Sequence, residues 1–529
     1  MHSKSGSRGT GHRGWWVTLI TLGIAVAASA AEIATGVVFE DANGNGLRDP
    51  GERGLRGVRV SNQRDIVTTD REGRWRLPVL DGPETTFFVI KPRGFTPPLS
   101  ADRLPRFFYT HKPAGSPPLK YAGVPPTGPL PASVDFPLSR QREPEVFQAL
   151  FFGDTQPRDL REVDYFKHDI VEELIGQTNA SFGVTLGDIV FDDLSVMEPH
   201  NAAVALIGIP WWNVIGNHDI NTDAPDADAF DDTYNRLYGP NYFSFDYGPV
   251  HFVALDNIRW VPPAERTSSS TWRPSLDERQ LAWLEADLQG VPQRQLVLLM
   301  MHVPINDLAN REAVYRLIEG RPYCLSIAGH THWHEHRFLK AEDGWRGARP
   351  HHHIVNVTAC GSWWGGAPDE LGIPQTTMSC GAPNGYTVLT FRDRGVSVDF
   401  KAARRPGGYQ MNIHTPETVA SAATGSTPVY VNLFNGAENS VVEMRLNNRG
   451  PWLKLQQVRE PDPVFVAQRE REGTNAVAPW RLLPKPIPSP HLWKGSLPDG
   501  LPPGTHYICV QGRDVNGTLH PAMRAITVE

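Results

Sequence analysis

The sequence predicts an α/β protein with additional β domains at both ends. Between residues 146 and 402, short apolar runs alternate with stretches of helical spacing at 163–177 and 276–290. This alternation is typical of an α/β core. On either side of it, strand-like segments dominate, and in the C-terminal part Asn-Gly breaks separate them. We therefore expect a small N-terminal β-sandwich, a central α/β core and a C-terminal β-sandwich.

Length and composition are consistent with this division. The chain has 529 residues, and at roughly 150 residues per domain this corresponds to about three domains. We place their boundaries at 32–140, 145–404 and 405–529. The composition is 40% hydrophobic and 21% charged, with a net charge of −7. This balance does not favour a nucleic-acid polymer or an anionic membrane as a partner.

The first 31 residues have the pattern of a secretory signal peptide. Basic residues and histidines lie within the first thirteen positions, an apolar run extends from Trp15 to Ala27, and an Ala-x-Ala site ends at Ala30. The alternative is a short membrane anchor, but the run is shorter than the ~20 residues of a span. We expect an exported protein, periplasmic or secreted, with no membrane span after cleavage.

Export gives the four cysteines an oxidising context. Cys360 and Cys380 bracket one loop, whereas Cys324 and Cys509 are distant in sequence. We expect a Cys360–Cys380 disulfide; the alternative is four buried thiols.

The first β domain contains a candidate calcium loop. Its residues fit the pattern D-x-[DN]-x-[DN]-G-x₅-E at every fixed position, although the flanking segments are strand-like and not helical. The alternative is an Asn-Gly-rich turn whose side chains satisfy backbone groups. The pattern consists of Asp41, Asn43, Asn45, Gly46, Asp49 and Glu52.

Residues 92–138 are rich in proline and also contain the aromatic segment RFFYTH. Such a segment is too aromatic for a free tether, so we expect an ordered extension that lies on a neighbouring domain.

Five polar clusters in the α/β segment each directly follow an apolar run. Ligand sites of α/β sheets gather at the carboxyl ends of strands, so five such ends point to one site. Glycines beside the clusters allow sharp turns and leave room for ions. The clusters are Asp154 and Gln156, Asp188, Asn217 to Asp219, His302, and His330 and His332.

The side chains of these clusters are oxygen and nitrogen ligands suited to Mn²⁺, Fe, Zn²⁺ or Mg²⁺. Asp188 has two carboxylate oxygens and is suited to bridging two ions. A metal pair activates a hydroxide and neutralises charge on a phosphoryl group. The clusters therefore predict two divalent metal ions.

The ordered set D-x-Q, G-D, G-N-H-D, H and G-H-x-H resembles the calcineurin-like metallophosphoesterase superfamily. Three further segments, FYTHKPAGSP, YFSFDYGPVHFVALDN and VYVNLFNG, resemble a bacterial subgroup with β domains on both sides of the core. The resemblance implies a four-layer α-β-β-α core of two packed mixed sheets. It also implies two ligand sets: Asp154, Gln156, Asp188 and His332 for the first metal, and Asp188, Asn217, His302 and His330 for the second.

The resemblance further implies that His218 is the general acid, that Asp219 orients it, and that a metal-bridging hydroxide attacks phosphorus in line. Gln156 departs from the commoner Asp-x-His form of the family. An amide oxygen is a weaker donor than imidazole, so we expect a looser first metal and a shift towards harder ions such as Mn²⁺ or Mg²⁺.

Other residues near these clusters carry weaker expectations. Trp363 and Trp364 are candidates for an aromatic wall that contacts substrate, or for packing against a β domain. Arg259 is a candidate phosphate contact. Asp192 and Asp193 follow the Asp188 turn, and we expect them to be solvated; the alternative is that they support the ligand residues. We expect His334 and His336 at the surface. Alternation on a strand would separate the side chains of His351 to His353, so these also stay outside the ligand set.

Together these features predict an exported two-metal phosphoesterase for mono- or diesters. The substrate class is a small-molecule, lipid-type or nucleotide-type phosphoester, and the sequence sets no oligomeric state. The alternative is a surface or matrix binding protein whose β domains carry the function and whose core is inactive.

Overall fold

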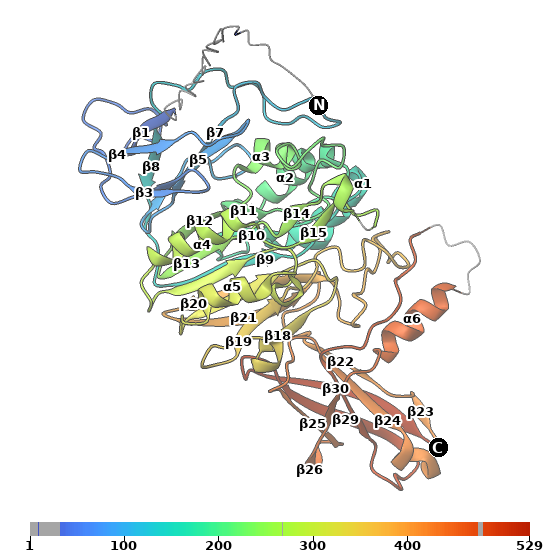
Figure 1. The fold of residues 1–529 in the computed structure, drawn as a ribbon. Coiled ribbons are helices and arrows are strands. Elements are labelled where there is room, and N and C mark those ends of the chain that lie inside the picture. Colours follow the sequence, from blue (N-terminus) through green and yellow to red (C-terminus); the bar gives the residue numbers. More distant parts are fainter. Residues whose placement is uncertain (1–8, 10–31, 267, 474–479) are drawn as a thin grey trace, which may run out of the picture.

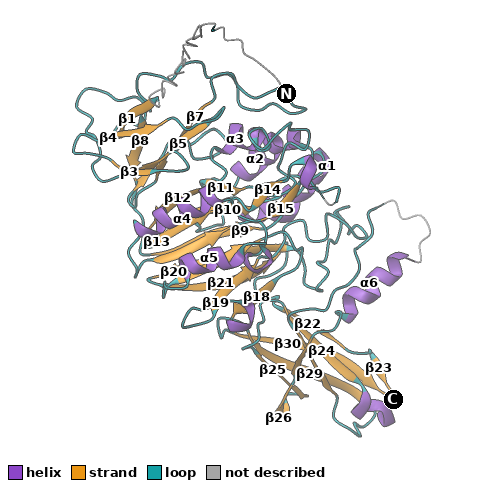
Figure 2. Cartoon of the chain, viewed as in Figure 1, coloured by secondary structure: helices purple, strands orange, loops and turns teal. Residues whose placement is uncertain are grey.

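The computed structural model describes residue 9 and residues 32–266, 268–473 and 480–529 (Figures 1 and 2). The predicted signal peptide lies outside these residues, apart from residue 9. Within the described part of the chain, no helix is both long and apolar enough to cross a bilayer.

Two mixed sheets form the centre of the molecule. In the five-stranded sheet, β9, β10 and β11 run parallel, and β20 and β21 continue it antiparallel. In the six-stranded sheet, β13, β16, β17 and β19 are parallel, with an antiparallel strand at each edge. The first sheet has the order β11 (Trp211–Val214), β10 (Phe182–Leu186), β9 (Val146–Phe152), β20 (Gly385–Arg392), β21 (Gly395–Ala402). The second has the order β12 (Phe243–Tyr247), β13 (Val250–Ala254), β16 (Leu296–Met300), β17 (Cys324–Ala328), β19 (His351–Val355), β18 (Glu335–Leu339).

Aromatic side chains fill the space between the two sheets. The Phe182 ring of β10 lies 5.2 Å from the Phe252 ring of β13, and Trp212 of β11 stacks on Phe245 of β12 at 4.1 Å between centroids. Alternation along each strand places these residues on one face. Large rings in contact fix the distance and register of the two sheets.

Helices cover the two outer faces. Phe166 of α1 (Leu160–Phe166) contacts Phe152 of β9 and stacks on His200 of α2 (Met197–Ala205). On the other sheet, Asp287 of α4 (Glu278–Gln289) hydrogen-bonds residues of β12 and β13. The remaining core helices are α3 (Asp232–Tyr238) and α5 (Arg311–Ile318), and a hairpin of β14 (Ile258–Trp260) and β15 (Trp272–Pro274) extends from the core. The core is thus the four-layer α-β-β-α arrangement that the family resemblance implies.

The two segments of helical spacing differ in regularity. The segment 276–290 forms α4, whose N-terminus is capped by Asp277: its side chain accepts a hydrogen bond from the Gln280 N–H. The segment 163–177 gives α1, a π turn (Lys167–Val171) and a 3₁₀ turn (Glu172–Leu174).

The N-terminal β domain consists of two four-stranded sheets. The expected strands are present, and the domain's apolar residues belong to one hydrophobic cluster with those of the core. One sheet has the order β4 (Arg74–Pro78), β1 (Ile33–Glu40), β8 (Phe136–Arg140), β6 (Phe95–Thr96), and the other β3 (Ile66–Thr68), β2 (Arg59–Ser61), β5 (Thr85–Ile90), β7 (Phe108–His111).

The proline-rich extension lies on the core, as expected. Phe107 is buried, with its ring 5.1 Å from the rings of both Trp212 and Phe243. The buried Lys112 forms ion pairs with Glu84 and Asp232, which joins the extension to α3. These contacts bury charge and apolar surface together, so the segment is no free linker.

The C-terminal domain is a β-sandwich with a hydrophobic cluster of its own, and α6 (Pro463–Gly473) lies beside it (Figure 1). One sheet has the order β22 (Met411–His414), β24 (Pro428–Leu433), β28 (Leu492–Ser496), β27 (Gln456–Val458). The other has the order β23 (Thr418–Val419), β30 (Leu519–Val528), β29 (Gly504–Arg513), β25 (Val441–Leu446), β26 (Arg449–Lys454).

The expected Cys360–Cys380 disulfide is not formed. All four cysteines are free, and those two are buried. Cys360 packs beneath the polar residues that follow β9, whereas Cys380 belongs to a small cluster against Phe400 and Phe434. Bracketing a loop therefore did not bring the two sulfurs together.

The histidines that we expected at the surface are buried. His334 and His336 both point towards Asn435 of the C-terminal domain, and its side-chain oxygen lies 3.3 and 2.9 Å from their Nε2 atoms. On β19, alternation separates His352 from His351 and His353, both of which contact Ser326 Oγ at 2.8 Å. The surface prediction failed because β18 is covered by the C-terminal domain.

A buried charged triad ties α4 to the six-stranded sheet. His251 has Nδ1 2.8 Å from Asp246 Oδ1 and Nε2 2.8 Å from Asp287 Oδ2. Burial opposes the charged imidazole, but the charge of Asp287 and hydrogen bonds from both carboxylates raise the pKa of His251 to about 9. Arg59 of the N-terminal domain also binds Asp287.

We predict that this triad makes the free energy of unfolding decrease as the pH rises. The contribution of His251 is fully present below its ordinary pKa of 6.5 and is lost as the pH rises through about 9. The loss is on the order of 3 kcal/mol, at 1.4 kcal/mol per unit of pKa shift. Urea unfolding at several pH values checks this. His251→Gln should flatten the profile, whereas the exposed His168→Gln should leave it unchanged; an equal slope in His251→Gln would contradict the assignment.

Candidate metal centre

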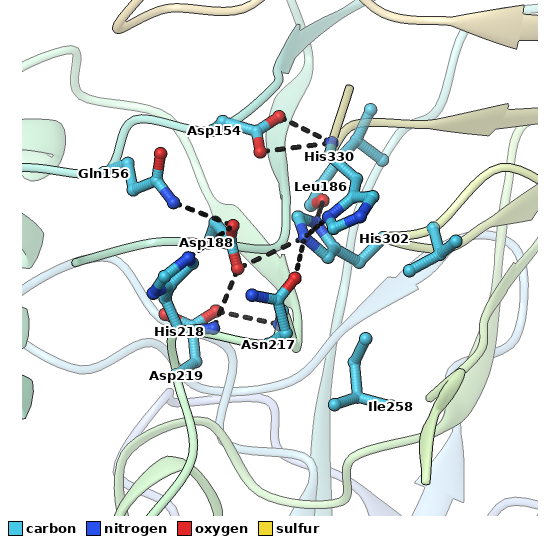
Figure 3. A network of polar contacts seen from close by, with 12 residues as sticks. Asp154, Gln156, Leu186, Asp188, Asn217, His218, Asp219, Ile258, His302 and His330 are labelled. Atoms are coloured by element: carbon cyan, nitrogen blue, oxygen red, sulfur yellow. Dashed lines mark hydrogen bonds and ion pairs between the residues drawn. The ribbon is translucent and has the colours of Figure 1, made fainter. Parts of the chain in front are cut away.

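The five predicted strand ends meet at one place. β9, β10 and β11 of one sheet and β16 and β17 of the other end facing each other, and their loops carry the polar clusters (Figure 3). The structure brings all seven predicted ligands into one connected network of contacts, most of it drawn in Figure 3.

Asp188 is the centre of this network. Its Oδ1 lies 3.2 Å from His302 Nε2 and accepts a hydrogen bond from the His218 N–H, while its Oδ2 lies 2.8 Å from Gln156 Nε2. Asp188 is 2% exposed. Its carboxylate therefore contacts three other loops at once, which is the position that a bridging ligand requires.

Two backbone carbonyls set the tautomers of the histidines. His302 Nδ1 lies 2.9 Å from the Leu186 carbonyl, and His332 Nδ1 lies 2.7 Å from the Gly361 carbonyl. Only a protonated nitrogen can donate there, so either ring in its neutral form directs its Nε2 lone pair towards the carboxylates. Such an outer hydrogen bond is the usual partner of a metal-binding histidine.

Nitrogen and oxygen atoms of three candidate ligands face one another across the site. His330 Nδ1 lies 3.1 Å from His302 Nε2, which in turn lies 3.1 Å from Asn217 Oδ1. Ligand atoms of Asp188, His302 and His330 all lie within 4.8 Å of one another. Burial lowers the pKa of His330 to about 4, so this ring is neutral and available to a cation.

The second half of the site surrounds Asp154. Its carboxylate accepts a hydrogen bond from the His330 N–H, and its Oδ1 lies 3.6 Å from His332 Nε2. Burial raises the pKa of Asp154 to about 7, whereas it lowers that of His332 to about 3. A buried carboxyl and a neutral imidazole without a charge between them are poorly solvated, and a divalent cation would satisfy both.

Gln156 lies at the edge shared by the two halves. Its Nε2 faces Asp188 Oδ2, and its Oε1 lies 3.8 Å from Cys360 Sγ. A half-turn about the last side-chain bond exchanges the amide oxygen and nitrogen, and it would direct the oxygen towards the carboxylates. The geometry is therefore compatible with an amide ligand.

Glycines keep the loops close to the ligands. A Cβ on Gly187, which has φ +82°, would lie 2.5 Å from His302 Nδ1. At Gly216 it would lie 2.0 Å from the Asp188 backbone nitrogen. Side chains at either position would separate the loops that the site requires to touch.

The general-acid candidate has a different partner from the expected one. His218 Nδ1 lies 2.6 Å from Asp192 Oδ1, and its Nε2 points into the site, 4.0 Å from Asp188 Oδ2. Burial disfavours the imidazolium, but Asp188 and Asp192 raise the pKa of His218 to about 9. The Phe191 ring stacks on the imidazole at 4.5 Å.

The prediction that Asp219 orients His218 is therefore wrong. The Asp219 carboxylate accepts hydrogen bonds from the backbone N–H groups of Gly216, Ile189 and Val190, at 2.8 to 3.2 Å. Adjacent residues in this turn point apart, so Asp219 fixes the two loops while Asp192, more than half exposed, contacts the imidazole.

The expected substrate contacts occupy three different environments. Trp363 stacks on the His332 ring at 3.9 Å and is only partly buried. Trp364 is buried and donates a hydrogen bond to the Thr155 carbonyl, so it packs behind the site. Arg259 is exposed on β14 and lines a cavity of about 520 Å³ beside the N-terminal domain.

Sequence reasoning missed several residues of the site. Trp272 lies edge-on to His330 with 5.8 Å between ring centroids, and Cys360 Sγ lies 3.7 Å from His332 Nδ1. Phe191 and Arg481 are the other two residues beside the site that sequence reasoning did not predict. The position of Phe191 three residues after Asp188 was a usable signal; nothing local marks Arg481, which is about 150 residues from the last ligand.

The candidate calcium loop satisfies its own backbone. Asp41 accepts from the N–H groups of Gly44 and Gly46, and Glu52 accepts from Ala42 and Asp49. Asn43 and Asn45 both donate side-chain hydrogen bonds to Asp49 Oδ2, at 2.7 and 2.8 Å. These contacts match the alternative interpretation of a self-satisfied turn, and calcium binding stays a prediction.

Three family models match the chain along most of its length. The model of calcineurin-like phosphoesterase matches residues 147–334, its N-terminal model residues 42–120 and its C-terminal model residues 353–519. A curated relative, the serine/threonine-protein phosphatase CPPED1 of Pongo abelii, is 35% identical over 99 residues, which are 18% of this chain and 29% of that protein.

Two solved structures match parts of this chain with low TM-scores. A purple acid phosphatase from yellow lupin (Lupinus luteus) is 12% identical, with a TM-score of 0.35, and the match covers 65% of this chain and 66% of that one. CopC from Methylosinus trichosporium OB3b is 12% identical, with a TM-score of 0.13 over 22% of this chain and 85% of that one.

The order of matched models follows the order of domains in the structure. The central match ends at His334, just after the last candidate ligand, and spans the convergent strand ends. The chain spans less than a third of the length of the curated relative, and it belongs to the calcineurin-like phosphoesterase family, in the subgroup with its own N-terminal and C-terminal domains.

Proposed function

We propose that this protein is an exported phosphoesterase that uses two divalent metal ions and His218 as its general acid. The observation that carries the proposal is the Asp188 carboxylate, which is buried between loops of both sheets beside two histidines with Nε2 or Nδ1 directed inward. Export rests on the sequence of residues 1–30.

The donor set fits two ions. Asp154, Gln156 and His332 lie on one side of Asp188, and Asn217, His302 and His330 lie on the other. Bound there, divalent ions would lower the pKa of a water molecule and neutralise charge on the phosphoryl group. Asp188 strongly attracts the proton of His302 and raises its pKa to about 9, so ion binding requires the release of that proton.

In this proposal His218 protonates the leaving oxygen. Its Nδ1 is engaged by Asp192, which leaves Nε2–H free to donate inward, beside Asp188. A raised pKa keeps the imidazole protonated at neutral pH, which is the state that a general acid requires.

The substrates that we propose are small-molecule, lipid-type or nucleotide-type phosphate esters. The alternative of a binding protein with an inactive core would be favoured by lost ligands. The only departure from the expected set is Gln156, whose amide oxygen is still a metal donor.

The first prediction concerns activity. With Mn²⁺, the protein should hydrolyse an aryl phosphate or an aryl phosphodiester. Asp188→Ala should abolish this because both ion positions lose a ligand. His218→Ala should lower kcat by about 10²- to 10⁴-fold, the usual contribution of a general acid. Steady-state kinetics with Asp193→Ala as the control will show whether both effects are specific; full activity in both variants would refute the proposal.

The second prediction concerns Gln156. Gln156→His should keep or raise Mn²⁺ affinity because imidazole is the stronger donor. Gln156→Leu should weaken it by tenfold or more, because it removes the donor while retaining similar volume. Titration calorimetry and metal analysis measure both; unchanged binding in Gln156→Leu would exclude Gln156 as a ligand.

The third prediction concerns Asp192. Its negative charge and hydrogen bond raise the pKa of His218, so Asp192→Asn should lower that pKa. Because the acid must be protonated, the basic limb of the kcat/KM profile should move to lower pH. Asp193→Asn, whose carboxylate contacts Ser195 instead, should leave the limb in place. A shift of equal size in both variants would exclude a specific role for Asp192.

A further inference from the structure

One cation beside the metal centre has no anionic partner. The guanidinium of Arg481 belongs to the C-terminal part of the chain, and among the described residues no carboxylate oxygen lies within the 4.0 Å of an ion pair. Burial and the nearby charge of Arg158 lower the pKa of Arg481. Arg158 itself is paired with Glu162, so the uncompensated positive charge at this place is that of Arg481.

Two aromatic rings connect Arg481 to the site. Its Cζ lies 5.8 Å from the centroid of Phe191, whose ring stacks on His218, and 5.3 Å from the centroid of Trp363, whose ring stacks on His332. One aromatic ring therefore separates the guanidinium from the general-acid candidate His218, and another separates it from the candidate metal ligand His332.

The backbone holds Arg481 at this position. Its carbonyl accepts a hydrogen bond of 2.7 Å from the Gly366 N–H, in the loop that carries Trp363. Glu472 at the end of α6 accepts hydrogen bonds from the N–H groups of Ala367 and Leu483. Two chain segments from different domains are thus joined on both sides of Arg481.

The position of Arg481 relative to His218 indicates what it faces. The leaving oxygen of the substrate must approach His218 Nε2 to be protonated, so the alcohol portion lies on the His218 side of phosphorus. Phe191 covers the His218 ring, and Arg481 covers Phe191. The alcohol portion extends on this side of the site, so it is the part of the substrate that a guanidinium beside Phe191 would contact.

We propose that Arg481 is a specificity-determining residue that binds a second anionic group, a carboxylate or a phosphate, on the alcohol portion of the phosphoester. This inference rests on the proposed function and names its substrate class. Guanidinium forms paired hydrogen bonds with either anion and keeps its planar face on an aromatic ring while doing so. Phe191 and Trp363 supply those rings, and the C-terminal domain thereby becomes part of the active site.

Binding of non-hydrolysable analogues tests this directly. Phenylphosphonate, 4-carboxyphenylphosphonate and benzene-1,4-bisphosphonate share the aryl phosphonate and differ in the second group. With the Mn²⁺-loaded protein, calorimetry should show tighter binding of the two analogues with a second anion. Arg481→Gln should weaken those two by about tenfold, the usual scale for a charge-assisted hydrogen bond, and leave phenylphosphonate unchanged. The one of these two analogues whose binding weakens more in Arg481→Gln carries the preferred anion, a carboxylate or a phosphate-like group.

Two further variants sharpen the result. Arg481→Lys keeps the charge but loses the planar fork, so its loss should be smaller than that of Arg481→Gln. Arg449→Gln, on the distant exposed strand β26, should match the wild type with every analogue.

Equal weakening of all three analogues by Arg481→Gln, or no weakening of any, would overturn the inference. Hydrolysis of phenyl phosphate by the wild type and by Arg481→Gln separates this outcome from a failure of the proposed function. If the wild type does not hydrolyse that neutral-alcohol ester with Mn²⁺, the proposed function fails; if both hydrolyse it equally while the analogues show no difference, only the inference on Arg481 fails.

Discussion

The metal centre depends on a backbone conformation that its own side chains disfavour. Five candidate ligands have positive φ, from 37° to 73°. A non-glycine residue in this region costs on the order of 1 kcal/mol or more and persists only where surrounding structure enforces it. The five are Asp154, Gln156, Asp188, His330 and His332.

Here the loops enforce the conformation on one another. The Gln156 N–H donates to the Asp188 carbonyl, and the His330 N–H donates to the Asp154 carboxylate. Each left-handed turn thus satisfies a group of the next loop. Because these bonds join strands of both sheets, the strain can be held only while the sheets stay packed. The aromatic interior of Phe182, Phe252 and their neighbours supplies that packing.

This dependence explains which parts of the site could be predicted. Ligands at strand ends are visible in the sequence, because an apolar run followed by Gly, Asp, Asn or His marks both the strand and the turn. The α/β core followed from the same alternation. The residues that contact the ligands are determined by the backbone conformation of the turns, which the sequence pattern does not show. Asp192, which has a positive φ of 62°, contacts His218, whereas Asp219, one residue from His218, points to backbone groups. Within this tight turn, the residue next to His218 in sequence is not the one that contacts its side chain.

Long-range packing accounts for the other differences. The burial of His334 and His336 and the separation of Cys360 from Cys380 are both set by where the C-terminal domain lies. No local pattern records a surface that another domain will cover. The same holds for Arg481, whose role is defined by rings about 120 and 290 residues away in the chain.

The interface that buries His334 and His336 also holds Arg481, which is distant in sequence, beside the metal ligands. Burial lowers the pKa of His334 to about 4 and that of His491 to about 3, so both rings are neutral and act as hydrogen-bonding groups at neutral pH. His334 and His336 meet Asn435, and His491 meets Asn432, which also binds the Cys380 carbonyl. A neutral, hydrogen-bonded interface avoids the desolvation cost of buried charge and is directional. A domain held in this way can present one charged side chain at a fixed place beside the metal ligands, which a flexible linker could not do.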